Sequence, residues 1–158
     1  MSGRLMKNIN LNWLAILVAA IVSFLFEAIW FTVFMKQWLA GIGRTMEWLQ
    51  GAATTTISPG VQYATALLCS IIAATILSIA IQATGEQTVR RGVLCAILIW
   101  IGFIATSWAK EYIFEVRTLE IFAINTGYSL IDLMLIGAIV GGWKKKSATL
   151  TARALNVD

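Results

Sequence analysis

Histidine is absent from the 158-residue sequence, and cysteine and proline are scarce. Without imidazole the chain cannot form a histidine-ligated haem or metal site, so we expect no metal ion and no cofactor. The two cysteines, Cys69 and Cys95, lie in apolar runs, which favours small core residues over a disulfide. A pairing between them stays open, because it depends on geometry that the sequence does not give.

Charged residues are also few. They make up 13% of the chain, against 59% hydrophobic residues, whereas soluble domains have about 25% charged and roughly 45–50% apolar residues. This composition excludes a disordered chain and an ordinary soluble enzyme. The apolar fraction is larger than a soluble domain needs for its core, and it points instead to a membrane protein.

Four apolar runs are long enough to cross a bilayer as helices. They cover about 13–35, 61–83, 92–110 and 121–143. A hydrocarbon core of about 30 Å needs roughly 20 helical residues, and backbone groups in lipid must be bonded within their own segment. The first run is too long for the apolar region of a signal peptide. The sequence therefore predicts an all-α fold, an integral membrane four-helix bundle, with residues 1–158 as a single transmembrane domain.

The basic residues are divided unevenly between the two predicted sides. Four spans put both termini and the second connection on one side, which holds eight of the twelve Lys and Arg residues. These are Arg4, Lys7, Arg90, Arg91, Lys144, Lys145, Lys146 and Arg153. The positive-inside rule makes that side cytoplasmic, in a multi-pass protein of the bacterial inner (plasma) membrane. The net charge of +4 is thus a topology signal. The expected partner is the lipid bilayer, with no nucleic acid, and a homodimer or larger membrane complex stays open.

Two acidic residues, Glu27 and Asp132, lie inside the predicted spans. At 1.5 Å per residue, Glu27 is about 21 Å from Trp13 and Asp132 about 16 Å from Trp143, so both lie near the midplane. No Lys or Arg lies deep in a span to neutralise them. An unpaired carboxylate in hydrocarbon costs several kcal/mol, so at least one acid should be protonated or reach water. We expect both to face the bundle interior or an oligomer interface.

Polar and aromatic residues surround both acids at helical spacing. Asn125, Tyr128, Ser129 and Asp132 fall on one helix face, and Trp30 follows Glu27 by about one turn. A structural interpretation is interhelical hydrogen bonding, worth about 0.6–2 kcal/mol per bond. A functional one is a site for a cationic or aromatic substrate, or for a proton. The candidate residues are Glu27, Trp30, Asn125, Tyr128 and Asp132.

The last predicted span contains the small-residue pattern Gly137-x-x-x-Gly141. Glycines at this spacing permit close approach of two membrane helices. The pattern predicts tight packing at this position, either within one chain or between two copies.

Three sequence blocks resemble a bacterial membrane family catalogued as domain of unknown function 1761. They comprise 12–15 running on to 38, then 99–103 with 112–115, and 124–128 running into 137–141. The Asn-x-Gly-Tyr of the third block is the most specific. The resemblance covers nearly the whole chain and implies a small four-helix integral membrane protein, but no activity.

The chain departs from the family pattern near its two buried acids. The family has Tyr, Ser and Pro after the first-helix tryptophan, where this chain has Phe31, Thr32 and Val33 after Trp30. The positions of Glu27 and Asp132 are usually small or apolar in the family. The resemblance therefore implies that any role of these acids is a specialisation of this chain's branch.

Three kinds of function fit these residues. The first is a small transporter or proton-coupled exporter that uses a midplane carboxylate, by analogy of size and helix count with the small multidrug resistance transporters. The second is an accessory or ligand-binding subunit of a larger membrane complex, holding a lipid, quinone or pigment. The third, an enzyme acting on lipid, has the least support, because no nucleophile–base pair or phosphate loop is recognisable. We do not expect an enzyme.

Overall fold

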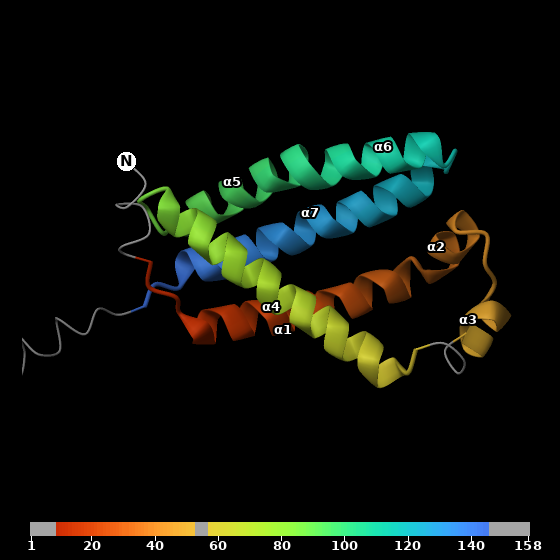
Figure 1. Ribbon diagram of the computed structural model, residues 1–158, viewed down its shortest axis with the longest axis horizontal. Coiled ribbons are helices and arrows are strands. Elements are labelled where there is room, and N and C mark those ends of the chain that lie inside the picture. The colour runs from red at the N-terminus through yellow and green to blue at the C-terminus, as the bar shows by residue number, and fades with distance from the viewer. Residues whose placement is uncertain (1–8, 53–56, 146–158) are drawn as a thin grey trace, which may run out of the picture.

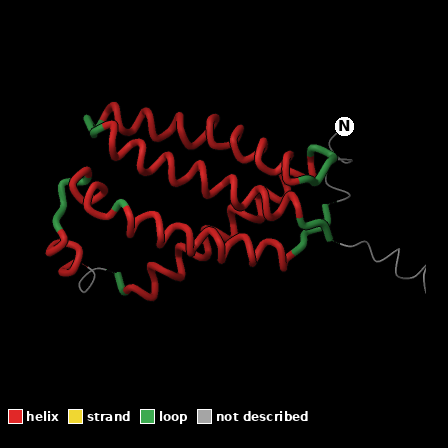
Figure 2. Tube along the Cα trace, turned by 180° about the vertical axis from the view of Figure 1, so that it is seen from behind, coloured by secondary structure: helices red, strands yellow, loops and turns green. Residues whose placement is uncertain are grey.

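The computed structural model describes residues 9–52 and 57–145, and in these ranges every regular element is a helix. The all-α prediction is confirmed. The elements, drawn in Figure 1 and Figure 2, are α1 (Trp13–Val33), α2 (Met35–Gly41), α3 (Met46–Ala52), α4 (Pro59–Ala83), α5 (Val89–Ile99), η1 (Trp100–Ala105), α6 (Thr106–Phe114) and α7 (Leu119–Gly142).

Side-chain caps fix where the long helices begin. Asn12, Ser58, Thr88 and Thr118 precede α1, α4, α5 and α7, and each accepts a hydrogen bond from the backbone N–H three residues later. Such caps satisfy one of the donors that a helix start leaves unpaired. Pro59 occupies the first position of α4, where its missing N–H costs nothing.

Four helical segments of the described chain are long and apolar enough to cross a membrane, as predicted. They are Trp13–Val33, Pro59–Ala83, Val89–Phe114 and Leu119–Gly142, with mean hydropathies between 1.6 and 2.4. This supports a multi-pass membrane protein. The third segment is longer than the predicted 92–110, because α5, η1 and α6 continue one another and the cap at the start of α5 brings basic residues into its first turn.

Helix α7 is the centre of the bundle. The segment α5–η1–α6 runs beside it, α1 packs on another side, and α4 crosses both α1 and α7 (Figure 1). At the end nearest the termini the helices are tied together: Asn12 donates to the Trp143 carbonyl oxygen at 3.2 Å, and the Asn10 N–H donates to Gln82 at 2.9 Å. At the opposite end, α2 and α6 stand apart from each other (Figure 1).

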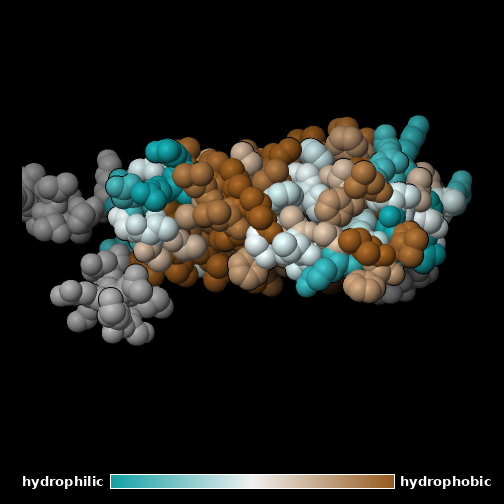
Figure 3. Space-filling model, turned by 90° about the horizontal axis from the view of Figure 1, so that it is seen from above, coloured by the Kyte–Doolittle hydropathy of each residue, from teal (hydrophilic) through white to brown (hydrophobic). Residues whose placement is uncertain are grey.

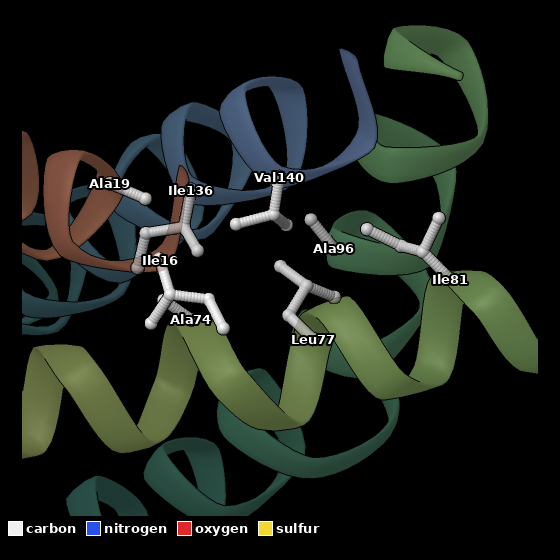
Figure 4. Close-up of a cluster of buried hydrophobic side chains, with 8 residues drawn as sticks. All are labelled: Ile16, Ala19, Ala74, Leu77, Ile81, Ala96, Ile136 and Val140. Carbon is white, nitrogen blue, oxygen red and sulfur yellow. The ribbon is translucent and has the colours of Figure 1, made fainter. Parts of the chain in front are cut away.

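A compact cluster of apolar side chains fills the half of the bundle nearer the termini. It draws on all four spans (Figure 4) and comprises Ile16, Ala19, Ala74, Leu77, Ile81, Ala96, Ile136 and Val140. Three of the eight are alanines, which let the helices approach closely. The residues of this cluster lie on the termini side of both buried acids, so the remaining half of the bundle is where polar groups can gather.

Glycines bring α5 and α7 into backbone contact. A Cβ at Gly92 would lie 1.9 Å from the Gly137 carbonyl oxygen, and one at Gly141 would lie 2.6 Å from the Thr88 carbonyl oxygen. The predicted close approach at Gly137 and Gly141 therefore occurs within the chain. Gly92, which completes the contact, was not expected from the sequence.

The outer surface carries the rest of the apolar side chains. Hydrophilic residues gather toward both ends of the face in Figure 3, with hydrophobic residues between them, as a bilayer requires. Cys69 and Cys95 are both free, and Cys69 is exposed on α4. The expectation of a core position was wrong for Cys69. In a membrane helix the lipid-facing side is as apolar as the side that faces the bundle core, so an apolar run does not show which residues are buried.

Candidate functional site

The two acids within the spans share one site. Glu27 of α1 and Asp132 of α7 are both half-buried and close enough to interact electrostatically. The Tyr128 hydroxyl group lies within hydrogen-bonding reach of the Glu27 carboxylate, and it also interacts electrostatically with Asp132. Measured from the termini side, Glu27 is about 21 Å along α1 and Asp132 about 15 Å along α7. Asp132 therefore lies about one turn nearer the termini than Glu27 does.

Two buried serines connect Asp132 to α1 and α4. Ser23 is within hydrogen-bonding reach of the Asp132 carboxylate, and its Oγ lies 3.1 Å from the Oγ of Ser70. The Ser70 hydroxyl in turn donates to the Ala66 carbonyl oxygen at 3.1 Å. Asp132 Oδ1 is buried and has no hydrogen-bond partner among residues 9–52 and 57–145. A carboxylate oxygen without a partner in a membrane span is costly unless a proton or a cation compensates it.

The hydrogens in this chain of groups can be arranged in two ways. With Asp132 protonated, the carboxyl group can donate to Ser23, Ser23 to Ser70, and Ser70 to the Ala66 carbonyl oxygen. With Asp132 ionised, the hydroxyls can reverse, so that Ser70 donates to Ser23 and Ser23 to the carboxylate. Every hydroxyl hydrogen is used in either arrangement. The site can therefore accept or release a proton without leaving a serine donor unpaired.

A pocket of about 400 Å³ lies on the side of Glu27 away from the termini. It is bounded by α1 and α2 on one side and by α6 and α7 on the other. It is lined by Glu27, Phe31, Trp38, Ile42, Trp108, Glu111, Arg117, Asn125, Tyr128 and Ser129. We call it the aqueous pocket, because it lies at the end of the bundle where the spans meet the α1–α4 and α6–α7 connections. Its walls are aromatic and its ionisable groups are mostly acidic.

The charge of the aqueous pocket is negative on balance. Arg117 pairs with Glu115 and lies over the Tyr112 ring, 5.7 Å from its centroid, so its charge is already compensated. Neither Glu27 nor Glu111 forms an ion pair with another residue of the described ranges. These two carboxyl groups, neither of them in an ion pair within the described ranges, make the pocket suited to a positively charged guest.

The aromatic wall is built on Tyr128. Its ring stacks on Phe26 at 5.9 Å with an interplanar angle of 14°, and it meets Phe31 at 5.2 Å. Phe31 also contacts Trp38 edge-on at 5.8 Å. Stacked and tilted rings of this kind are stable arrangements that hold their positions. The phenol is thereby held beside Glu27.

The other two predicted residues have supporting positions. Trp30 is outside the lining of the aqueous pocket: its indole N–H donates to the Ile124 carbonyl oxygen at 3.2 Å and its ring packs on Phe34. It therefore fixes α1 against α7. Asn125 does line the pocket, and its amide donates to the Tyr112 hydroxyl, which joins α7 to α6.

Several residues of the site were not expected from the sequence. Ser70 lies on the buried face of α4, eight residues before Ser78, and this spacing could have indicated it. Trp108 and Glu111 reach the pocket from α6, beyond the π-helical turn of η1. The turn is held by Trp100, whose indole N–H donates to the Thr126 carbonyl oxygen at 2.9 Å. Hydropathy gives no sign of a π turn, although such turns often mark functional sites.

Comparisons with known proteins add one match. A family model described as "Protein of unknown function (DUF1761)" matches residues 14–141, which include both acids and all four spans apart from their outermost residues. No curated protein and no solved structure matches the chain. The geometry of the site is therefore the main guide to what it does.

Proposed function

We propose that this chain, which belongs to the DUF1761 family of proteins of unknown function, is a small membrane transporter that exchanges protons for an organic cation. The observation that carries the proposal is the position of Glu27. Its carboxyl group lies in the wall of an aromatic pocket and interacts with a second buried acid, Asp132. Neither structural packing nor membrane insertion requires two ionisable groups at this depth.

The chemistry of the aqueous pocket favours a cation. Aromatic ring faces attract positive charge, and Phe31, Trp38 and Trp108 all line the space. Glu27 and Glu111 supply carboxyl groups that are negative when ionised. The volume of about 400 Å³ lies at the lower end of the roughly 300–1,000 Å³ of small-molecule pockets. A quaternary ammonium or an aromatic cation of modest size fits this description.

The proximity of the two acids supports exchange with protons. Two negative charges in a low-dielectric site repel each other, so the empty pair is more stable with one proton bound. A cation beside Glu27 offsets that repulsion and releases the proton. The reversible hydrogen-bond chain of Asp132, Ser23 and Ser70 gives the retained proton a place to reside.

A proton-release measurement tests the proposal. Purified protein in weakly buffered detergent is mixed with tetraethylammonium or tetraphenylphosphonium, and the pH change is recorded. The same cations are then offered to proteoliposomes under a pH gradient. Wild type should release protons and take up cation, and Glu27→Gln should do neither. Glu120→Gln is the matched control, because Glu120 is exposed in the first turn of α7 and does not line the pocket. A Glu27→Gln protein that transports as well as wild type contradicts the proposal.

The same experiment separates transport from the alternative role. An accessory or ligand-binding subunit would bind a cation or an apolar ligand in the aqueous pocket, without proton release and without uptake driven by a pH gradient. Binding alone, abolished by Glu27→Gln, would favour that role.

The proposal includes an orientation. We place the protein in the bacterial inner membrane with both termini in the cytoplasm, since most of its basic residues lie on the side of the termini. The aqueous pocket then opens toward the periplasm. Labelling of Glu120→Cys by a membrane-impermeant thiol reagent in intact cells, after both native cysteines are replaced by serine, tests this orientation. Absence of labelling until the cells are opened would reverse it.

A further inference from the structure

A second pocket lies on the other side of Glu27, between α1 and α4. It has a volume of about 250 Å³ and is lined by Phe24, Glu27, Ala28, Phe31, Gln62, Tyr63 and Ala66. We call it the lateral pocket. Glu27 and Phe31 line both this pocket and the aqueous pocket. One carboxyl group and one ring thus stand between two separate spaces.

The lateral pocket opens on the outer surface of the bundle, where Ala28, Gln62 and Tyr63 of its lining are exposed. Its residues on α1 lie about 3–14 Å from the helix end at Val33, and those on α4 lie about 5–11 Å from Pro59, so all of them are within the spans. Large apolar side chains next to the lining residues in sequence are exposed: Leu25 at 53% and Ile29 at 63% on α1, and Leu67 at 36% on α4. Hydrocarbon chains, not water, meet such a surface.

The lining of the lateral pocket combines aromatic and aliphatic side chains with the polar groups of Glu27 and Gln62. Phe24 and Tyr63 meet edge to face at 6.1 Å with an interplanar angle of 89°, which forms an aromatic wall between the two helices. Glu27 lines the same pocket and is less exposed than Tyr63. An acyl chain in the pocket would leave the carboxylate uncompensated, at a cost of several kcal/mol. A guest that carries both an apolar body and a positive charge would satisfy both parts of the pocket.

We propose that the lateral pocket is the membrane entrance of the site, through which a lipid-soluble organic cation reaches Glu27 from the bilayer between α1 and α4. This rests on the proposed function, and it names the substrate class: amphipathic aromatic cations that partition into the membrane interface. Small hydrophilic cations reach the same carboxyl group through the aqueous pocket. Glu27 is the meeting point of the two routes.

Two probes distinguish the routes. Tetraphenylphosphonium dissolves in the bilayer, and tetraethylammonium stays in water. Ala66→Phe fills the lateral pocket from α4, and Ala64→Phe is the matched control, because Ala64 is exposed two residues away and does not line the pocket. Ala66→Phe should slow tetraphenylphosphonium uptake into proteoliposomes by about tenfold or more, since a ring there overfills the pocket. Its effect on tetraethylammonium uptake should be at least about threefold smaller than its effect on tetraphenylphosphonium uptake, and Ala64→Phe should change the uptake of neither probe by more than about twofold. Equal slowing of both probes, or of neither, overturns the entrance.

A labelling experiment tests the entrance without relying on transport. In a chain with Cys69→Ser and Cys95→Ser, either Ala66→Cys or Ala64→Cys is introduced, and reaction with an apolar aromatic maleimide is timed in liposomes. Tetraphenylphosphonium should slow the reaction at position 66 by about threefold or more and leave position 64 unchanged, and Glu27→Gln should remove the protection. Lack of protection at position 66 refutes the entrance. Protection without any cation-driven proton release would leave the lateral pocket as a binding site and refute the exchange function instead.

Discussion

The contact between α5 and α7 gives a prediction whose size follows from distances. A methyl group at Gly92 would lie 1.9 Å from the carbonyl oxygen of Gly137, about 1.5 Å short of the 3.4 Å at which ordinary contact begins. The obstacle is backbone, so no side chain can rotate away. In Gly92→Ala the two helices must therefore separate. Overpacking of this kind costs about 1–3 kcal/mol, and the higher helix propensity of alanine offsets up to about 1 kcal/mol. We expect a net loss of about 1–2 kcal/mol in the free energy of unfolding.

A second glycine of the same span serves as the control. Gly102 lies in η1, and a Cβ there would meet nothing within 4 Å. Gly102→Ala should be neutral or more stable by up to about 1 kcal/mol. Unfolding in mixed detergent micelles, followed by circular dichroism as the denaturing detergent is increased, measures both variants. If Gly92→Ala unfolds at the same point as wild type or Gly102→Ala, the backbone contact does not stabilise the bundle and the packing argument is refuted.

The remaining predictions concern the groups around the two acids. Ser23→Ala should lower the free energy of unfolding by about 0.6–2 kcal/mol, because it interrupts the bond to α4; equal stability with wild type would show that the bond contributes nothing. Trp30→Phe keeps a ring but loses the N–H that donates to Ile124, so unfolding should cost about 0.5–1.5 kcal/mol less. The exposed Trp13 offers Trp13→Phe as the control, and equal effects in the two variants would contradict the role of the indole. Asp132→Asn should still bind tetraethylammonium, while its proton release falls at least about tenfold, because the amide cannot hold and release the proton that the carboxylate of Asp132 binds in wild type. Unchanged proton release, measured with the same dye assay, would assign the proton to Glu27 alone.

The spans could be predicted because membrane insertion depends on summed hydropathy over about 20 residues, a property that the sequence states directly. Their ends could be predicted less well. The first turn of α5 contains Arg90 and Arg91. Hydropathy alone predicts that the span begins after these two residues, but the helix begins before them because Thr88 caps it. Boundary residues are decided by local hydrogen bonds, not by partition into lipid.

The centre of the site also followed from the sequence. The helical spacing of Asn125, Tyr128 and Asp132 placed them on one face of α7, and the structure brings Glu27 to that face. The rest of the lining could not be predicted, because it depends on how the helices cross. Trp30 illustrates the difference: its nearness to Glu27 in sequence suggested a place in the pocket, yet its indole N–H is bound to α7.

The π-helical turn of η1 affects where the chain can lose a single residue without disrupting the packing of its helices. A π turn closes its hydrogen bonds over one residue more than an α turn does, so it holds one extra residue between two stretches of ordinary helix. Removing Gly102, which faces open space, should convert η1 into α-helix while α5 and α6 keep their faces toward α7. Removing a residue from the middle of α1 would instead rotate every later side chain by about 100°. A single-codon deletion should therefore be tolerated at this one place in the third span, and relatives of the chain are expected to differ there by one residue.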